Sequence, residues 1–287
     1  MKISKLFDKG KIVYSFEVFP PKRDNPIEGI YKTLDELRDL RPDFISVTYG
    51  AGGVLAGSNT AKIASYIKNT LGIESLAHLS CVNSDRDNVR EALKEFEDKG
   101  IENILALRGD IIPDVERKKD FFYAGDLITF IKEEGGDFGI SAACYPEGHP
   151  EAPSMEEDLF HLREKVEKGA THLVSQLFFE NHMFFEFKEK ARALGVTVPI
   201  EAGIMPVTNK KMIERMVSIA GASLPAKLTK LLHKYEFDDE ALREAGIAYA
   251  IDQMVDLIER GAEGIHLYTM NNPYVARKIT EGIKGLL

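Results

Sequence analysis

Short apolar segments alternate with amphipathic ones along the whole chain, and this alternation constrains the fold more than any other feature of the sequence. The apolar segments are rich in β-branched and aromatic residues. They lie at 11–19, 43–49, 74–81, 102–108, 138–144, 171–179, 198–204 and 263–269. Segments this short and nearly continuous in apolar character are typical of parallel strands that are buried on both faces. The sequence therefore predicts eight such strands.

Four amphipathic segments between these strands have the features of helices. Those at 58–72 and 85–100 each end on a glycine, the residue preferred just after a last helical turn. The segment at 154–169 begins with the Ser-x-x-Glu spacing of a capping box. The segment at 238–261 is the longest, and its alanines and methionines predict a well-buried helix.

Alternating strands and helices predict an α/β fold, and eight units predict a closed (β/α)8 barrel, also called a TIM barrel. The chain has no low-complexity linker and no break in composition, so we expect a single domain over 1–287. An open, doubly wound sheet is the alternative. No G-x-G-x-x-G follows the first strand, so the usual fingerprint of a dinucleotide-binding sheet is missing.

The composition excludes several classes of protein. The formal net charge is −9 with a pI near 5.4, and no basic stripe overrides it, so nucleic-acid binding is not expected. Cys81 and Cys144 cannot make a disulfide framework, and their wide spacing is not that of a structural zinc site. The first residues lack the apolar core of a signal peptide, and no run reaches membrane-spanning length. We expect a soluble, cytoplasmic protein.

Polar residues and glycines recur where the predicted strands end. In a (β/α)8 barrel the active site lies at the carboxyl ends of the strands, on the loops that follow them. The residues at these ends are Glu17, 48–53, His78, 108–110, 145–150, Gln176, 203–206 and 266–269. Their common edge predicts a site there.

Glu17 is the strongest single candidate from the residues alone. It lies within an apolar run that includes Phe16, Val18 and Phe19. A carboxylate in such surroundings is costly unless its pKa rises or it finds a partner, which makes Glu17 a candidate general acid. A surface charge is the alternative.

Two other features of the strand ends remain open on spacing alone. Gly50, Gly52 and Gly53 either make a turn or let the backbone approach a flat or phosphorylated ligand closely. Asp110 either forms a local ion pair or turn with Arg108 or has a function of its own.

Histidines and cysteines near the strand ends raise the question of a metal. His78, His149, His266, Cys81 and Cys144 show no H-x-H or H-E-x-x-H spacing, so we expect no metal site. The remaining histidines are interpreted as ordinary helix or strand-edge residues; they are His161, His172, His182 and His233.

Nine segments in one collinear order resemble the methylenetetrahydrofolate reductase family, specifically its catalytic barrel in the bacterial form without a regulatory domain. Each is weakly specific by itself, and together they cover nearly the whole chain. They are SFEVFPPK (15–22), VTYGAGG (47–53), AHLSC (77–81), ALRGD (106–110), YAGDL (123–127), AACYPEGHP (142–150), SQLFF (175–179), GIMPVTN (203–209) and HLYTMN (266–271).

The resemblance implies an activity in one-carbon metabolism and methionine biosynthesis. The family reduces 5,10-methylenetetrahydrofolate to 5-methyltetrahydrofolate, passing a hydride from NADH or NADPH through bound FAD in a ping-pong reaction. It implies that Glu17 is the catalytic acid, that Asp110 is catalytic beside the flavin, and that Gln176 is catalytic and, with Glu17, contacts substrate.

It also implies a set of residues that line FAD. These are Thr48, Tyr49, Ala51, His78, Arg108, Gly109, Asp110, Ala124, Tyr145, His149, Asp158 and Lys165. A small-molecule folate and a pyridine nucleotide are the expected partners, and the protein is expected to form homo-oligomers. A redox partner subunit is the alternative source of electrons.

Four positions depart from the family pattern. His161 and Glu164 stand where enterobacterial relatives carry other side chains near FAD, Met212 replaces a substrate-contacting glutamine, and Asn272 stands where an arginine is common. These departures concern recognition of the folate tail more than the FAD site.

Two other classes of function are alternatives. One is a different barrel enzyme, such as a pterin-dependent methyltransferase or an aldolase-like lyase, although no predicted strand ends in the lysine that such a lyase needs. The other is a flavin-bearing electron-transfer subunit of a larger folate-reducing redox complex. The joint presence of Glu17, Asp110 and Gln176 favours a catalytic barrel.

Overall fold

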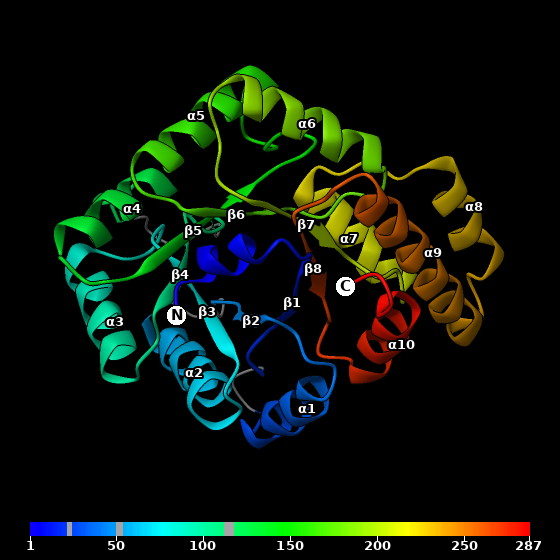
Figure 1. Ribbon diagram of the computed structural model, residues 1–287, viewed down its shortest axis with the longest axis horizontal. Coiled ribbons are helices and arrows are strands. Elements are labelled where there is room, and N and C mark those ends of the chain that lie inside the picture. Colours follow the sequence, from blue (N-terminus) through cyan, green and yellow to red (C-terminus); the bar gives the residue numbers. More distant parts are fainter. Residues whose placement is uncertain (22–24, 50–53, 112–117) are drawn as a thin grey trace.

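The computed structural model describes residues 1–21, 25–49, 54–111 and 118–287, and its strands form one closed parallel barrel (Figure 1). The strands are β1 (Val13–Val18), β2 (Phe44–Val47), β3 (Glu74–Ser80), β4 (Asn103–Leu107), β5 (Gly139–Cys144), β6 (His172–Ser175), β7 (Ile200–Ile204) and β8 (Gly264–Tyr268). Since β8 pairs in parallel with β1, the predicted (β/α)8 barrel is confirmed and the open sheet is wrong.

Each strand lies inside one of the eight predicted segments. β2, β6 and β7 are buried at every position, as expected for strands covered on both faces. The segment 171–179 differs most from its strand, because Leu177, Phe178 and Phe179 are buried in the loop after β6 rather than paired in the sheet. An apolar run alone does not distinguish a strand from a buried loop.

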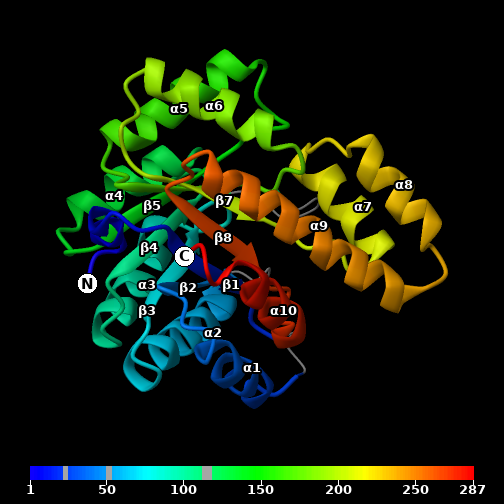
Figure 2. The same cartoon turned by 45° about the vertical axis from the view of Figure 1, so that its right-hand side comes forward.

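Helices surround the barrel (Figures 1 and 2). They are α1 (Glu28–Arg38), α2 (Val54–Ser65), α3 (Arg86–Asp98), α4 (Ala124–Glu133), α5 (Met155–Glu167), α6 (Asn181–Ala193), α7 (Lys210–Ala220), α8 (Ala226–Lys234), α9 (Asp239–Glu259) and α10 (Pro273–Ile283).

Three of the predicted helices, 85–100, 154–169 and 238–261, correspond to α3, α5 and α9. One of the two hydrogen bonds of the predicted capping box is present at the start of α5: the Ser154 side chain accepts from the Glu157 N–H at 3.2 Å. The segment at 58–72 is a helix that begins earlier than expected, at Val54, and continues into the π-helical turn η2 (Tyr66–Thr70).

The connection from β7 to β8 contains three helices instead of one. Figure 2 shows α7, α8 and α9 gathered at one side of the barrel. Leu228 and Leu232 of α8 and Ile213 of α7 share a separate apolar cluster with Leu242 of α9. This cluster gives the added helix pair its own small core beside the barrel.

The amino-terminal 3-10 helix η1 (Ile3–Lys9) closes the end of the barrel opposite the carboxyl edge. Its Ile3 and Leu6 are buried in a cluster with Phe44, Leu76 and Leu105 from the strands. The closure seals the barrel interior from that end.

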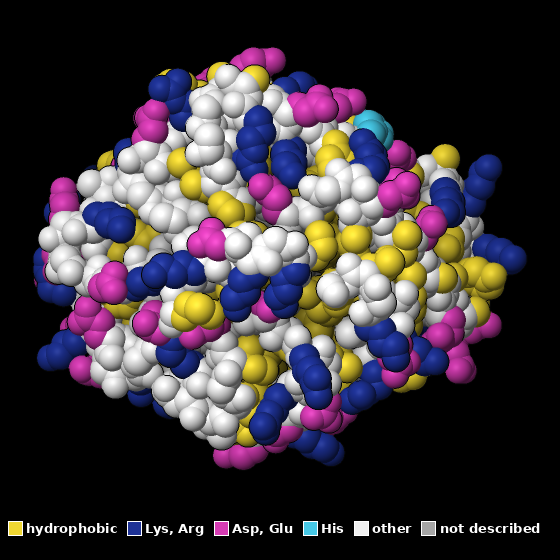
Figure 3. All heavy atoms as spheres, in the orientation of Figure 1, with side chains coloured by type: hydrophobic (Ala, Val, Ile, Leu, Met, Phe, Trp, Pro, Cys, Tyr) yellow, Lys and Arg dark blue, Asp and Glu magenta, His cyan; other side chains and the backbone are white. Residues whose placement is uncertain are grey.

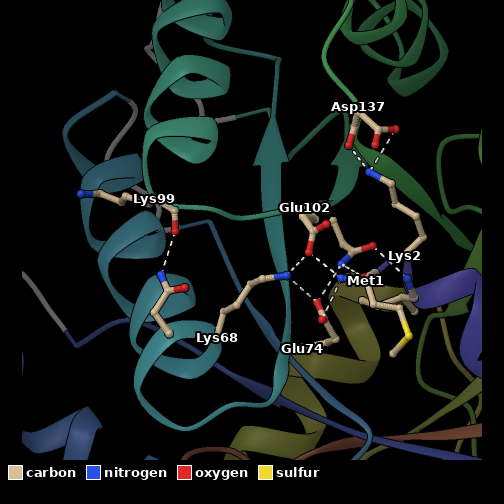
Figure 4. Close-up of polar contacts among 10 residues, drawn as sticks. Met1, Lys2, Lys68, Glu74, Lys99, Glu102 and Asp137 are labelled. Atoms are coloured by element: carbon tan, nitrogen blue, oxygen red, sulfur yellow. Dashed lines mark hydrogen bonds and ion pairs between the residues drawn. The ribbon is translucent and has the colours of Figure 1, made fainter.

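Ion pairs surround this closure at its edge. Figure 4 shows the Met1 amino group between the carboxylates of Glu74 and Glu102, both of which also contact Lys68. The Nζ–Oε2 distance from Lys68 to Glu74 is 2.9 Å. The cluster ties the amino terminus before η1 to the first residue of β3 and to the residue before β4.

The surface on this side carries lysines and arginines interspersed with acidic residues (Figure 3). This pattern agrees with the absence of a basic stripe in the sequence. Among the described residues, no helix is long and apolar enough to cross a membrane.

Candidate active site

A cavity of about 670 Å³ opens where β4 and β5 end, between α4 and α5. Six of the residues expected to line FAD lie along it: Arg108, Ala124, Tyr145, His149, Asp158 and Lys165. They come from sequence positions nearly sixty residues apart, and the barrel brings them together because adjacent parallel strands end at the same edge.

Helix α5 presents two charged residues into this cavity. The Lys165 Nζ donates to the Ala143 carbonyl at 2.6 Å, and Asp158 accepts from the His149 N–H at 3.2 Å. Burial raises the pKa of Asp158 and lowers the pKa of Lys165, while the attraction between the two opposes both shifts. Lys165 is half-buried, and its amino group keeps donors for an anionic ligand beyond the one bound to the carbonyl.

The segment after β4 arranges a cation at the mouth of the cavity. Both terminal nitrogens of Arg108 pair with the Glu151 carboxylate at 2.7 Å, so the ion pair considered between Arg108 and Asp110 is replaced by this one. Gly109 has φ +86°, and a Cβ there would lie 3.0 Å from the Ser80 Cβ. The turn that exposes Asp110 to solvent therefore favours glycine at this position.

Glu17 lies inside the barrel mouth, with its side chain 18% exposed. Its Oε2 is 3.4 Å from the Nε2 of His78 and 3.5 Å from the Nε2 of His266, and the Ser46 hydroxyl donates to it at 3.3 Å. Three neighbouring strands thus supply polar partners to one carboxylate.

Of the two outcomes expected for a carboxylate in an apolar run, a raised pKa or a polar partner, Glu17 shows the second. Burial does raise its pKa, but the hydrogen bond from His266, the charges of His78 and His266 and the Ser46 hydroxyl together lower the pKa below its ordinary value. The sequence shows the apolar residues beside Glu17 in the chain, but not the polar residues across the barrel.

His78 itself is buried, and burial lowers its pKa to about 4. Within the described part of the chain its Nε2 has no hydrogen-bond partner. This nitrogen contacts the Glu17 carboxylate at 3.4 Å without a hydrogen bond, so it can still bind a polar atom of a ligand.

The remaining predicted residues occupy the same edge. Gln176 follows β6, with its Oε1 accepting from the Leu177 N–H at 2.8 Å. Thr48 and Tyr49 follow β2. Ala51 lies outside the described residues.

Glu151 and Tyr123 along the cavity were not singled out from the sequence, whereas His161 and Glu164 were noted there as departures from the family pattern near FAD. Glu151 pairs with Arg108, and the Tyr123 ring is stacked on His161 with 5.7 Å between centroids and 16° between planes. His161 also contacts Glu164 at 2.9 Å. The repeated acidic and aromatic residues after β4 and β5 give no distinctive spacing, so only the folded structure unites them.

His172 is not an ordinary strand-edge residue, so that interpretation is wrong. It is fully buried, and its Nε2 lies 2.9 Å from the Oε2 of Glu201, which is fully buried too. Glu201 stands in the apolar run of β7 just as Glu17 stands in that of β1. The same signal that identified Glu17 could have found it.

Fold and site together define a (β/α)8 barrel with a polar, ligand-sized cavity at its carboxyl edge, the arrangement common to barrel enzymes. A profile of the family described as "Methylenetetrahydrofolate reductase" matches residues 2–284. The chain is 36% identical over 263 residues to "5,10-methylenetetrahydrofolate reductase" of Pectobacterium carotovorum, covering 92% of this chain and 87% of that protein. The chain belongs to the methylenetetrahydrofolate reductase family.

A plant relative is longer. "Methylenetetrahydrofolate reductase (NADH) 1" of Arabidopsis thaliana is 36% identical over 284 residues, and the match covers 94% of this chain but only 48% of the plant protein. The chain thus spans about half the length of that relative.

Among solved structures, an uncharacterised protein from Clostridium thermocellum, described as binding two copies of 5-methyl-5,6,7,8-tetrahydrofolic acid, superposes with a TM-score of 0.71. It covers 100% of this chain and 99% of its own at 14% identity. That likeness shows the shared fold.

Proposed function

We propose that this protein reduces 5,10-methylenetetrahydrofolate to 5-methyltetrahydrofolate, using NADH or NADPH and bound FAD in two successive half-reactions. Family membership and the names of the bacterial relatives support the reaction. The observation that carries the assignment to this site is Glu17, held in the barrel mouth by partners from three strands. In this proposal the protein works in the cytoplasm as a homo-oligomer.

The cavity beside β4 and β5 fits the chemistry of FAD. Lys165, Arg108 and His149 offer donors to phosphate oxygens, and Tyr145 offers an aromatic ring along a cavity of about 670 Å³. The Nε2 of His78 offers a polar partner on the Glu17 side of the site. When bound, FAD would supply the group that accepts hydride from the nicotinamide and gives it to the folate.

The residues of the chain would then handle charge and protons at the folate. The methylene bridge must open before its carbon can receive hydride, and opening needs a proton at N10. Glu17 would deliver that proton as the general acid, from the protonated form that its lowered pKa makes the minor one at neutral pH. Asp110, exposed after β4, would stabilise the cation that develops on the opened folate, and Gln176 would orient the pterin ring.

The visible spectrum of the purified protein, followed anaerobically, tests this function. We expect a flavin band that NADH or NADPH bleaches and that methylenetetrahydrofolate then restores. Absence of flavin binding, even after FAD is added, would reject the proposal.

The same experiment separates the alternative of a partner-dependent subunit. Flavin that ignores both pyridine nucleotides but is bleached by dithionite and restored by the folate would indicate that another protein supplies the electrons. In that case the protein would reduce the folate as proposed, but NADH or NADPH would not be its direct electron donor.

A further inference from the structure

A chain of buried polar side chains crosses the barrel interior from Glu17 to the opposite strands. Ser15 of β1 lies 2.6 Å from the Nδ1 of His266 and donates to the Oε1 of Glu201 at 2.9 Å. The Oε2 of Glu201 contacts the Nε2 of His172 at 2.9 Å, and the Nδ1 of His172 contacts the Ser141 hydroxyl at 2.9 Å. None of the residues beyond Glu17 is more than 2% exposed.

An ionised Glu201 fixes the direction of the two hydrogen bonds that link it to His266. An ionised carboxylate only accepts, so the Ser15 hydroxyl must donate to it and its oxygen must accept from the Nδ1–H of His266. The Nε2 of His266 is then the nitrogen that faces Glu17, at 3.5 Å. On the other arm the Nε2 of His172 donates to Glu201, and its Nδ1 lies 2.9 Å from the Ser141 hydroxyl.

The neighbouring strand leaves room for Glu201. Gly264 is its register partner on β8, and a Cβ at Gly264 would lie 2.6 Å from the Cγ of Glu201. A side chain on β8 at this level would displace the carboxylate. The sequence of β8 is therefore compatible with Glu201 at the centre of the barrel.

A carboxylate in this position is costly for stability alone. Barrel interiors are usually filled by branched apolar side chains, and replacing a buried ionic network with such residues is often neutral or stabilising. Here the network ends on Glu17, the residue that would protonate the folate in the proposed reaction.

We propose that Glu201 is a positioning residue for Glu17: through Ser15 it keeps the Nδ1 of His266 protonated, so that the proton His266 exchanges is the one on Nε2, facing Glu17. Glu17 and His266 then share one proton across their hydrogen bond, and the negative charge of Glu201 stabilises that proton when it resides on the imidazole. This role rests on the proposed function, in which Glu17 protonates the folate.

The other titratable groups that face the pair have pKa values shifted away from neutral pH by burial. His78 faces Glu17 from β3, and burial lowers its pKa to about 4. Tyr268 of β8 lies with its ring edge-on to His266, and burial raises its pKa well above the ordinary value. Ser46 of β2 and the Phe44 ring, stacked on His266, carry no charge.

Two serine variants test the proposal as a matched pair. Ser15→Ala removes the link between Glu201 and His266, whereas Ser141→Ala removes an equally buried hydroxyl from the Nδ1 of the other histidine. Heteronuclear NMR of the imidazole nitrogens, with His266→Asn to assign the signals, reports which nitrogen of His266 is protonated. In Ser15→Ala we expect His266 to populate both tautomers. In Ser141→Ala we expect its Nδ1 to stay protonated.

The pH dependence of the folate half-reaction is the second readout. In Ser15→Ala the imidazolium loses its hydrogen-bonded link to the carboxylate, so the pair gives up its proton more readily. The pH at which the rate of the folate half-reaction declines should be lower by on the order of one unit in Ser15→Ala. It should not change in Ser141→Ala. Glu201→Met, which removes the charge as well, should lower that pH further.

The proposal would be overturned if Ser15→Ala changed neither the tautomer of His266 nor the pH at which the folate half-reaction declines. Equal effects of the two serine variants would also overturn it. Should Glu201→Met fail to fold, the serine pair decides. If the unmodified protein reduces no methylenetetrahydrofolate, the proposed function fails, and the NMR comparison still decides whether Glu201 fixes the tautomer.

Discussion

At the scale of single residues, a carboxylate is defined by what the fold places opposite it. Glu17 and Glu201 both interrupt apolar runs, and both find histidine partners from other strands. Glu17 keeps some contact with the open mouth, since its side chain is 18% exposed, whereas Glu201 is fully buried. The first is placed to meet a substrate and the second is placed to orient another side chain.

Replacing the acid by its amide separates the two proposed half-reactions. Glu17→Gln keeps the size of the side chain but removes the proton, so folate reduction should fall by on the order of a hundredfold or more. Flavin reduction by NADH should persist, because it needs no proton at the folate. Stopped-flow absorbance of each half-reaction measures both.

Glu133→Gln, an exposed change on α4, is the matched control and should alter neither rate. Equal folate half-reaction rates for Glu17→Gln and the unmodified protein would assign the acid to another group.

What the sequence reveals at this scale is limited by distance along the chain. The polar residues at the strand ends could be placed at one edge because parallel strands end together. The shift in the pKa of Glu17 could not be foreseen, because Ser46, His78 and His266 approach it from strands that are remote in sequence. The stack of Tyr123 on His161 was hidden for the same reason.

At the scale of elements, helix α5 connects local stability to the cavity. Ser154 caps its first turn, and Asp158 and Lys165 lie further along the same helix with their side chains at the cavity. A looser first turn would therefore disturb the position of Asp158 before that of Lys165. The capping spacing in the sequence predicted this helix start, but the apolar pattern did not predict which face would meet a ligand.

Removing the cap should lower both stability and cofactor retention. Ser154→Ala leaves a backbone N–H without its acceptor, which costs about 1 kcal/mol in the free energy of unfolding. Urea unfolding followed by circular dichroism measures this loss, and the flavin-to-protein absorbance ratio after dialysis measures retention.

Ser223→Ala is the control, since Ser223 is an exposed serine whose backbone N–H, rather than its hydroxyl, contacts Glu147. Identical unfolding midpoints for the two variants would show that the cap contributes nothing to the helix.

At the scale of the whole molecule, the eight-fold alternation was enough to predict the closed barrel. The helices α7 and α8 were not foreseen, because a single crossover is the common connection and nothing in the apolar pattern before α9 marks the start of a second layer. The closure of the far end by η1 also could not be predicted. A short polar segment with two buried side chains, Ile3 and Leu6, has no periodic signal.

The ion cluster at that closed end predicts how the whole fold responds to acid. Hydrogen bonds from Lys68 and the amino terminus lower the pKa of Glu102 from its ordinary 4.5 to about 2. A lowered pKa means that the stabilisation is present above pH 4.5 and is lost as pH falls towards 2. Because Glu102 is 41% exposed, solvent screening keeps the effect modest.

In Glu102→Gln the loss of stability between these two pH values should be shallower than in the unmodified protein. Thermal unfolding midpoints across that range measure it, with Glu281→Gln on the exposed face of α10 as the control. Parallel pH curves for Glu102→Gln and the unmodified protein would remove Glu102 from the acid response.

The sealed end has a consequence for timing in the proposed reaction. The polar chain from Glu17 stops at Ser141, and the Phe7 ring of η1 lies 5.0 Å from His172 across the route to the far end. Among the described residues this polar chain does not reach the far end, so a proton would reach Glu17 through the mouth, which a bound folate would cover. Glu17 and His266 would therefore hold one proton before the folate binds, and would take up the next proton only after the product has left.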